Sequence, residues 1–309
     1  MNRSFNALGV DIGGTKVAAG VVRFPEGIIH AQRTIPTQAF RGGIAVLDDV
    51  ESLARSLAAE ADRSGTPVEG IGLGLCELVS PQGRILSANA IDWQNLPVAE
   101  RLGSIAPTMI DADVRAAARA EALFGAGKPF RQFLYVTVGT GIASCLMLDG
   151  TPFMGARGAT GTMASSPLSI PCGNCGHINR RTLEELAAGP ALVARYNALH
   201  PGGARSGQDV MSAAASGDPD AIFVVRSAGE ALESAVGWLV NVLDPEAVII
   251  GGGLGLSEGL FWDEFIAATR NHIWSDVHRD LPILRAGTGP EAGFIGAAAA
   301  AWQNEARKS

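Results

Sequence analysis

The sequence has few cysteines, no long apolar run and no concentration of basic charge. Four cysteines among 309 residues are too few for the disulfide framework of a small secreted protein. No apolar stretch approaches the roughly 18 residues that cross a bilayer, and residues 1–6 lack the apolar core of a signal peptide. The net charge is -7 with acids and bases interspersed, unlike the basic stripe that binds nucleic acid. We therefore expect a cytoplasmic protein with no membrane or nucleic-acid partner.

Apolar runs that alternate with glycine-rich turns predict an α/β protein, and the hydrophobic fraction of 47% allows a sizeable core. A chain of this length exceeds what one core usually holds, so we expect two lobes with a cleft between them. Strands are predicted over residues 7–10, 15–24, 28–35, 68–79, 107–112, 133–138, 142–148 and 247–250. Helices are predicted over residues 43–63, 114–124, 183–196, 219–243 and 293–303, and residues 155–181 are expected to form a loop.

Two predicted hairpins turn on glycines. Glycine lacks a Cβ, so backbone amides in such a turn stay open to phosphate oxygens. The first turn has an acid and a lysine beside its glycines. The second hairpin repeats the strand–glycine–strand pattern later in the chain, as expected for two similar lobes. A triple glycine after the strand at 247–250 could lie flat against an adenine ring, although it is often only a turn. These nucleotide-binding candidates are Asp11, Gly13, Gly14, Thr15, Lys16, Gly139, Thr140, Gly141, Gly252 and Gly253.

Four segments together resemble the ROK family of sugar kinases and repressors: Leu8–Lys16, Val138–Ile142, Leu243–Gly253 and Ala292–Ala298. The resemblance implies the two-lobed actin-like ATPase, or ribonuclease H-like, fold with the active site in the interdomain cleft. It also implies ATP with Mg²⁺, a hexose or hexosamine as acceptor, and a homodimer or homotetramer.

The lobes expected from this resemblance divide the chain after Asp113. Residues 1–113 plus 294–309 would form the N-terminal lobe, with the phosphate hairpin and the acceptor pocket. Residues 114–293 would form the C-terminal lobe, with the nucleotide contacts, a possible zinc loop and the oligomer contacts.

The general base of the family is an aspartate that opens a helix after a short strand, and Asp113 occupies that position. A carboxylate fixed at such a junction can accept the proton of an attacking hydroxyl, which contributes roughly 10²- to 10⁴-fold to the rate. An aspartate there could instead simply cap the helix. Asp111 is a nearby competitor for the role of base, and the asparagines that flank the aspartate in the family are Ala112 and Arg115 here.

The predicted sugar pocket departs from the family pattern. The glutamate and histidine that hold sugar hydroxyls in the family are replaced by Thr162 and Ser165, so a substrate that depends on them should be rejected. Glu77 follows the strand before the pocket. It could bind an amine of an amino sugar or aminocyclitol, or it could face solvent. Asn89 and Glu184 match family residues that contact the sugar.

The zinc motif of the family is also altered. Cys172, Cys175 and His177 could supply three ligands to a structural Zn²⁺, but a fourth ligand is not visible in the sequence. The alternative is a glycine-rich loop with two reduced thiols.

Three functions remain open at this point. The leading hypothesis is a kinase that transfers the γ-phosphoryl group of ATP to a hydroxyl of a hexose, amino sugar or aminocyclitol. The altered pocket also permits a sugar- or nucleotide-binding sensor that has lost kinase activity. A repressor is disfavoured, because we expect no helix-turn-helix module ahead of the first hairpin.

Overall fold

The computed structural model describes residues 4–171 and 178–307, and backbone contacts divide the chain into two compact units. Unit 1 comprises residues 1–129, 147–160 and 287–309, and unit 2 comprises residues 130–146 and 161–286. By these contacts residues 114–129 group with unit 1, whereas the lobe boundary predicted from the sequence falls after Asp113. The assignment of roles to the lobes stays a prediction.

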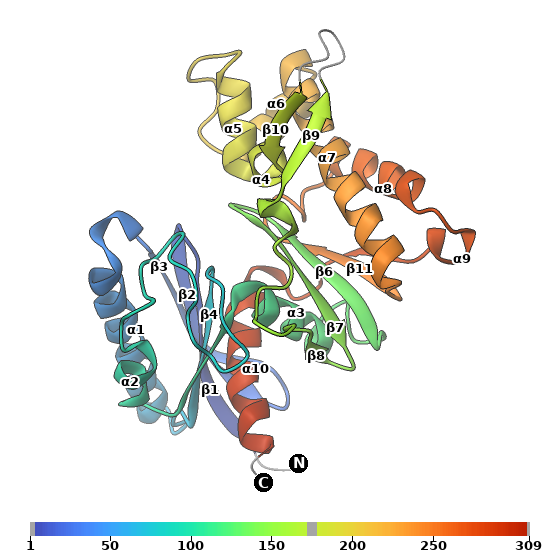
Figure 1. Ribbon diagram of the computed structural model, residues 1–309. Helices are drawn as coiled ribbons and strands as arrows, with labels where there is room; N and C mark the ends of the chain where they lie inside the picture. Colours follow the sequence, from blue (N-terminus) through green and yellow to red (C-terminus); the bar gives the residue numbers. More distant parts are fainter. Residues whose placement is uncertain (1–3, 172–177, 308–309) are drawn as a thin grey trace. The chain divides into compact units, whose positions relative to one another are not determined.

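A five-stranded sheet with helices on both faces forms unit 1 (Figure 1). Its order is β3-β2-β1-β4-β5, in which β1–β2 and β2–β3 are antiparallel and β1–β4 and β4–β5 are parallel. The strands are β1 (Phe5–Ile12), β2 (Lys16–Phe24), β3 (Ile28–Pro36), β4 (Gly70–Leu75) and β5 (Thr108–Ala112). The helices are α1 (Gly43–Arg63), α2 (Val98–Gly103), α3 (Asp113–Phe124) and α10 (Ala292–Ala306), with short 3₁₀ turns η1 (Ala39–Arg41) and η3 (Gly289–Glu291).

Alternation along β1 explains the two layers of helices. Leu8, Val10 and Ile12 pack in one core with the apolar face of α1, whereas Ala7 packs in the core that contains α10, because successive strand residues point to opposite faces. Glycines let α10 approach closely: a Cβ on Gly72 of β4 would lie 1.7 Å from the carbonyl oxygen of Ala297. The backbone of α10 therefore packs directly against the backbone of β4.

Unit 2 contains most of a second five-stranded sheet, whose order is β12-β11-β6-β7-β8. The division between the units falls within β7. The strands are β6 (Gln132–Val138), β7 (Ile142–Leu148), β8 (Thr151–Pro152), β11 (Ala247–Gly251) and β12 (Ile283–Arg285), and β9 (Pro167–Pro171) pairs separately with β10 (Ile178–Thr182). The helices are α4 (Glu184–Ala187), α5 (Gly189–Asn197), α6 (Gly207–Ala215), α7 (Pro219–Leu243), α8 (Leu260–His272), α9 (Asp276–Arg279) and the 3₁₀ turn η2 (Met163–Ser165).

The predicted hairpins, the mixed sheet and the long helices are confirmed, but the stretch from 155 to 196 is not. Residues 155–181, predicted as loop, contain η2, β9 and part of β10. The helix predicted over 183–196 is two helices, because Pro190 favours a new helix start and Gly189 turns its N–H to the carbonyl of Gly139, 2.8 Å away. No helix of the described ranges is long and apolar enough to cross a membrane.

Candidate active site

Asp113 is the first residue of α3, directly after β5. Asp113 is not the helix cap considered above, since Ala112 holds the N-cap position. Within the described ranges, the carboxylate of Asp113 accepts one hydrogen bond, from the neighbouring N–H of Val114 at 2.6 Å. Burial, reinforced by the negative charge of Asp11, raises the pKa of Asp113 to about 7, although the Val114 N–H opposes the shift. A carboxylate with such a pKa can take up a proton near neutral pH.

Asp11 lies at the end of β1, beside Asp113. The two acids flank Gly74 of β4: a Cβ there would lie 3.3 Å from the Cα of Asp113 and 3.7 Å from a carboxylate oxygen of Asp11. Gly293 in the first turn of α10 is closer still to Asp11, since a Cβ built on it would lie 2.2 Å from Asp11 Oδ2. Burial raises the pKa of Asp11 to about 6, and Lys16 partly offsets it. Glycines in two neighbouring elements therefore make room for this pair of acids.

The Gly13–Gly14 turn follows Asp11 and is anchored from outside the hairpin. Gly13 donates to the carbonyl of Lys16 at 3.0 Å, which closes the turn. Thr37 is 1% exposed, and its hydroxyl donates to the carbonyl of Gly13 at 2.6 Å. Gly14, Thr15 and Lys16 remain exposed, as an anion-binding turn requires. No motif in the sequence marks Thr37, which follows β3.

Asp111, the competitor for the role of base, is held in a buried ion network. Arg115 donates to Asp111 Oδ1 at 2.5 Å and Arg119 donates to Oδ2 at 2.9 Å. Arg115 also donates to the carbonyl of Val79 at 2.7 Å and reaches that of Gly158 at 3.5 Å. Both carboxylate oxygens of Asp111 are thus occupied by charged donors, which gives Asp111 a structural role.

Glu77 is 5% exposed and its carboxylate is turned into the protein. It accepts bonds from the Ser87 hydroxyl and from the backbone N–H groups of residues 89, 90 and 91. The side chain therefore does not face solvent, and its hydrogen-bonding positions are used inside unit 1. Asn89, in contrast, has an exposed side chain.

Unit 2 carries the second glycine turn, between β6 and β7. Gly139 donates to the carbonyl of Gly141 at 2.9 Å, and Glu184 Oε1 accepts the N–H of Ile142 at 2.8 Å. Glu184 thus braces this turn: a Cβ on Gly141 would lie 2.5 Å from its carboxylate. The triple glycine lies beside the same turn, since a Cβ on Gly139 would be 3.8 Å from the N of Gly253. The two glycine segments that sequence analysis assigned to nucleotide binding are neighbours within one unit.

The remaining predicted site residues lie between residues 162 and 177, shortly before or within the gap between the described ranges. Thr162 and Ser165 are exposed at η2. The candidate zinc ligands Cys172, Cys175 and His177 lie outside the described residues. Among the described residues, one group has the spacing of a cation site: His200, Asp218 and Asp220 of unit 2. Asp218 there already caps α7 and accepts the hydroxyl of Tyr196, so this group has a structural role.

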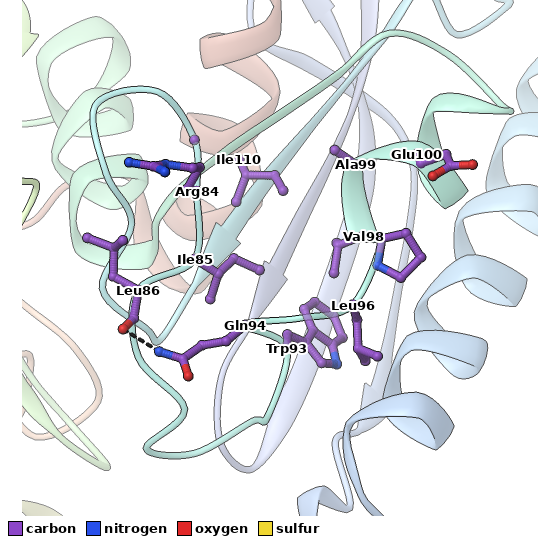
Figure 2. Close-up of a pocket in the computed structure, with 12 residues that line it drawn as sticks. Arg84, Ile85, Leu86, Trp93, Gln94, Leu96, Val98, Ala99, Glu100 and Ile110 are labelled. Atoms are coloured by element: carbon purple, nitrogen blue, oxygen red, sulfur yellow. Dashed lines mark hydrogen bonds between the residues drawn. The ribbon is translucent and has the colours of Figure 1, made fainter.

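Away from the acids, unit 1 has an open depression of about 560 Å³ (Figure 2). It is lined by residues 83–86, 93–94 and 96–100 together with Ile110, and none of the predicted site residues is among them. Gln94 spans its edge through a hydrogen bond to the carbonyl of Leu86, drawn dashed in Figure 2.

Comparison with known proteins yields one consistent group. The family model described as "ROK family" matches residues 7–304. The bifunctional enzyme NanE/NanK of Brucella melitensis is 33% identical over 293 residues, 94% of this chain and 53% of that protein. The chain thus spans about half the length of the NanE/NanK enzymes it matches. The glucokinase of Streptomyces coelicolor is 30% identical over 315 residues, 94% of this chain and 96% of that one.

A solved structure gives the same result. The ROK family glucokinase from Streptomyces griseus, in complex with glucose and AMPPNP, superposes with a TM-score of 0.81 at 27% identity, and the match covers 96% of this chain and 99% of that chain. The actin-like ATPase fold predicted from the sequence is thereby confirmed.

Proposed function

The chain belongs to the ROK family, and from this premise we propose that it transfers the γ-phosphoryl group of ATP to a hydroxyl of a small sugar. The observation that supports this most is Asp113, a carboxylate with a pKa raised to about 7, at a strand-to-helix junction beside Asp11 and the Gly13–Gly14 turn. The kinases among the relatives act on sugars by name, and the Streptomyces griseus enzyme binds an ATP analogue.

In the proposed reaction the acceptor hydroxyl oxygen attacks the γ-phosphorus, the bond to the β-phosphate oxygen breaks, and ADP leaves. Asp113 accepts the hydroxyl proton as the oxygen–phosphorus bond forms. The amides of the Gly13–Gly14 turn and the ammonium of Lys16 stabilise negative charge on the phosphates. The turn at Gly139–Gly141, with Gly252 and Gly253, is proposed to contact the nucleotide.

Mg²⁺ fits the donors that surround the first turn. Among the described residues the carboxylate of Asp11 accepts no hydrogen bond, and hard oxygen donors are the ligands that Mg²⁺ prefers. When bound, the ion would neutralise charge on the phosphates. Asp11 is the residue we propose to hold it, directly or through its waters.

The hydrogen bonds of Glu77 bear on which phosphoryl acceptor we propose. The argument for an amino sugar or aminocyclitol rested on this carboxylate alone, and its oxygens are used by the protein. We therefore propose a hexose or hexose derivative that contacts Asn89, with Thr162, Ser165 and Glu184 contributing where the family places its sugar contacts.

A coupled ADP-release screen with hexoses, hexosamines and aminocyclitols tests the proposal. We expect at least one neutral sugar to stimulate ADP release well above the sugar-free rate, and the Asp113→Asn variant to lose that stimulation. If no compound stimulates ADP release while calorimetry still detects AMPPNP binding, the proposal is wrong and a nucleotide-binding sensor without kinase activity takes its place.

A further inference from the structure

Glu77 anchors residues 87–91, a segment without regular secondary structure. Its Oε2 accepts the Ser87 hydroxyl and the N–H of Asn89, at 2.9 Å for the latter, and its Oε1 accepts the N–H groups of Ala90 and Ile91 at 2.6 and 2.9 Å. Ser87 is fixed in turn, because its hydroxyl accepts the N–H of Leu78 at 2.8 Å. One buried side chain thus binds four donors of residues 87–91, which lie 10 to 14 positions further along the chain.

These bonds use the whole acceptor capacity of the carboxylate. An ionised carboxylate offers about four lone-pair sites, and each oxygen of Glu77 already accepts two bonds. Burial by itself raises the pKa of Glu77, but the Ser87 hydroxyl and the three backbone N–H groups outweigh it, and the pKa is lowered overall. Glu77 is therefore a charged group at neutral pH, saturated by its own chain, with no site left for a substrate amine.

The segment 87–91 has no regular secondary structure, since residues 86–92 form neither helix nor strand. The two arms that lead into and out of it both line the 560 Å³ depression of Figure 2, and Gln94 of one arm donates to the carbonyl of Leu86 in the other. The far end of the segment is held by Ile91, which is 4% exposed and packs in the core with α1. Next to it, the indole N–H of the buried Trp93 donates to the carbonyl of Gly43 at 2.7 Å. Ahead of Ile91, the hydrogen bonds to Glu77 hold the backbone N–H groups of Asn89 and Ala90.

Two residues of this segment, Asn89 and Ala90, bear on the proposed sugar and phosphate contacts. Asn89, the predicted sugar contact, has its N–H bound to Glu77 while its side chain is exposed. Ala90 lies beside the phosphate turn, since a Cβ built on Gly14 would be 3.7 Å from the Ala90 Cβ. A displacement of about 1 Å in a group that positions substrate can cost on the order of 100-fold in rate.

We propose that Glu77 is a positioning residue for the acceptor sugar: its buried carboxylate holds residues 87–91 so that Asn89 is presented beside the Gly13–Gly14 turn. The inference rests on the proposed sugar kinase function for its kinetic consequences, but its structural part stands without it. It also assigns to Glu77 a role different from binding an amine.

Three variants test separately the charge of the Glu77 side chain, its length and the number of hydrogen bonds it accepts. Glu77→Gln places an amide NH₂ against backbone N–H donors, so at least two of the four bonds are lost. Glu77→Asp keeps the charge but is one methylene shorter. Ser87→Ala removes a single donor. Glu26→Gln, an exposed glutamate of the same unit, is the matched control.

We expect Glu77→Gln to raise the KM for the sugar about 10-fold or more, Glu77→Asp to raise it less, and Ser87→Ala least, while the KM for ATP stays within about 3-fold of the parent in each. A neutral sugar and its amino counterpart should lose the same factor. Glu26→Gln should change neither KM. If the sugar KM is unchanged in Glu77→Gln, or if only the amino sugar is affected, the positioning role is wrong.

Hydrogen–deuterium exchange tests the same inference without any reaction. The amides of residues 89–91 should be protected in the parent protein and exchange at least about 10-fold faster in Glu77→Gln, with little change in α1 or α10. Equal exchange in the two proteins would overturn the proposal. Because this readout needs no substrate, it distinguishes failure of the positioning role from failure of the proposed kinase function, in which the parent would phosphorylate no sugar at all.

Discussion

Two pairs of acids in unit 1 differ in how many of their oxygens already accept hydrogen bonds. Asp111 and Glu77 are saturated: two arginines hold Asp111, and a hydroxyl and three amides hold Glu77. Asp11 and Asp113 accept one hydrogen bond between them among the described residues, and burial raises the pKa of both. Asp111 and Glu77 thus hold parts of the protein together, whereas the carboxylates of Asp11 and Asp113 have acceptor positions that no described residue uses.

This contrast shows that burial does not by itself mark a reactive acid. Asp11 and Glu77 both act on the charge of Asp113, and Asp11 and Asp111 lie on either side of Gly74 in the sheet, but only an acid with unused acceptor positions can exchange a proton without breaking the fold. The predictions below test that division, beginning with the largest effect.

Asp113→Asn should lower kcat by roughly 10²- to 10⁴-fold, because an amide cannot accept the hydroxyl proton. Nucleotide affinity, measured by calorimetry with AMPPNP, should be retained. Asp62→Asn, an exposed aspartate on α1, is the control and should leave kcat unchanged. A turnover within 3-fold of the parent would show that Asp113 is not the base.

Asp111→Ala should destabilise the protein by about 3–5 kcal/mol, because it leaves the buried guanidinium groups of Arg115 and Arg119 without their partner. Denaturant unfolding measures the loss. The control is Asp49→Ala, which breaks a partly exposed ion pair with Arg41 and should cost only about 0–1 kcal/mol. Similar losses in the two variants would remove the distinction between structural and reactive acids.

The pH profile of kcat/KM should rise as the pH increases through about 7, where Asp113 loses its proton. Below that pH the rate should fall toward 10-fold per pH unit, because the protonated acid cannot act as base. The measurement is initial rate against pH at low sugar concentration. A profile that is flat between pH 6 and 8 would contradict the assignment.

The smallest expected effect is a change in the melting temperature of the Asp113→Asn variant with pH. Burial raises the pKa of Asp113 in the folded state to about 7, above its ordinary value of 3.8, so its protonation favours the folded state at low pH and this contribution is lost as the pH rises through 7. At pH 8 the buried charge is a cost that Asp113→Asn removes. We expect the variant to melt about 2–4 °C higher at pH 8 and the gain to shrink toward pH 5. A gain that grows as the pH falls would refute the assignment.

Much of the fold could be predicted because its signals are local. The glycine turns, the apolar runs of the strands and the helical period of α1 are each encoded in a few neighbouring residues, and the identity of Asp113 as candidate base came from family resemblance. The structure adds contacts between distant residues. Thr37 anchors the first turn from beyond β3, and Glu184, predicted as a sugar contact, also braces the second turn.

The orientation of the Glu77 carboxylate could not be predicted from the sequence. Whether its carboxylate faces solvent, a substrate or its own chain depends on the path of residues 87–91, a segment with no hydrophobic period to define it. The same limit applies to the stretch from 155 to 196, where short strands and a break at Gly189 arise from pairing partners and not from local propensity.

The close contact between α10 and the first sheet has a consequence for how the protein is made. Gly9 and Gly72 leave room for the backbone of α10 and for no side chain, since a Cβ on Gly9 would lie 1.8 Å from the carbonyl oxygen of Phe294. Gly293 of the same helix lies against Asp11. α10 follows every strand of this sheet in the sequence, so it is synthesised after all of them. Asp11 therefore acquires its final surroundings only once α10 has been made and has packed on the sheet, and a nascent chain that has not reached residues 292–306 lacks one wall of this site.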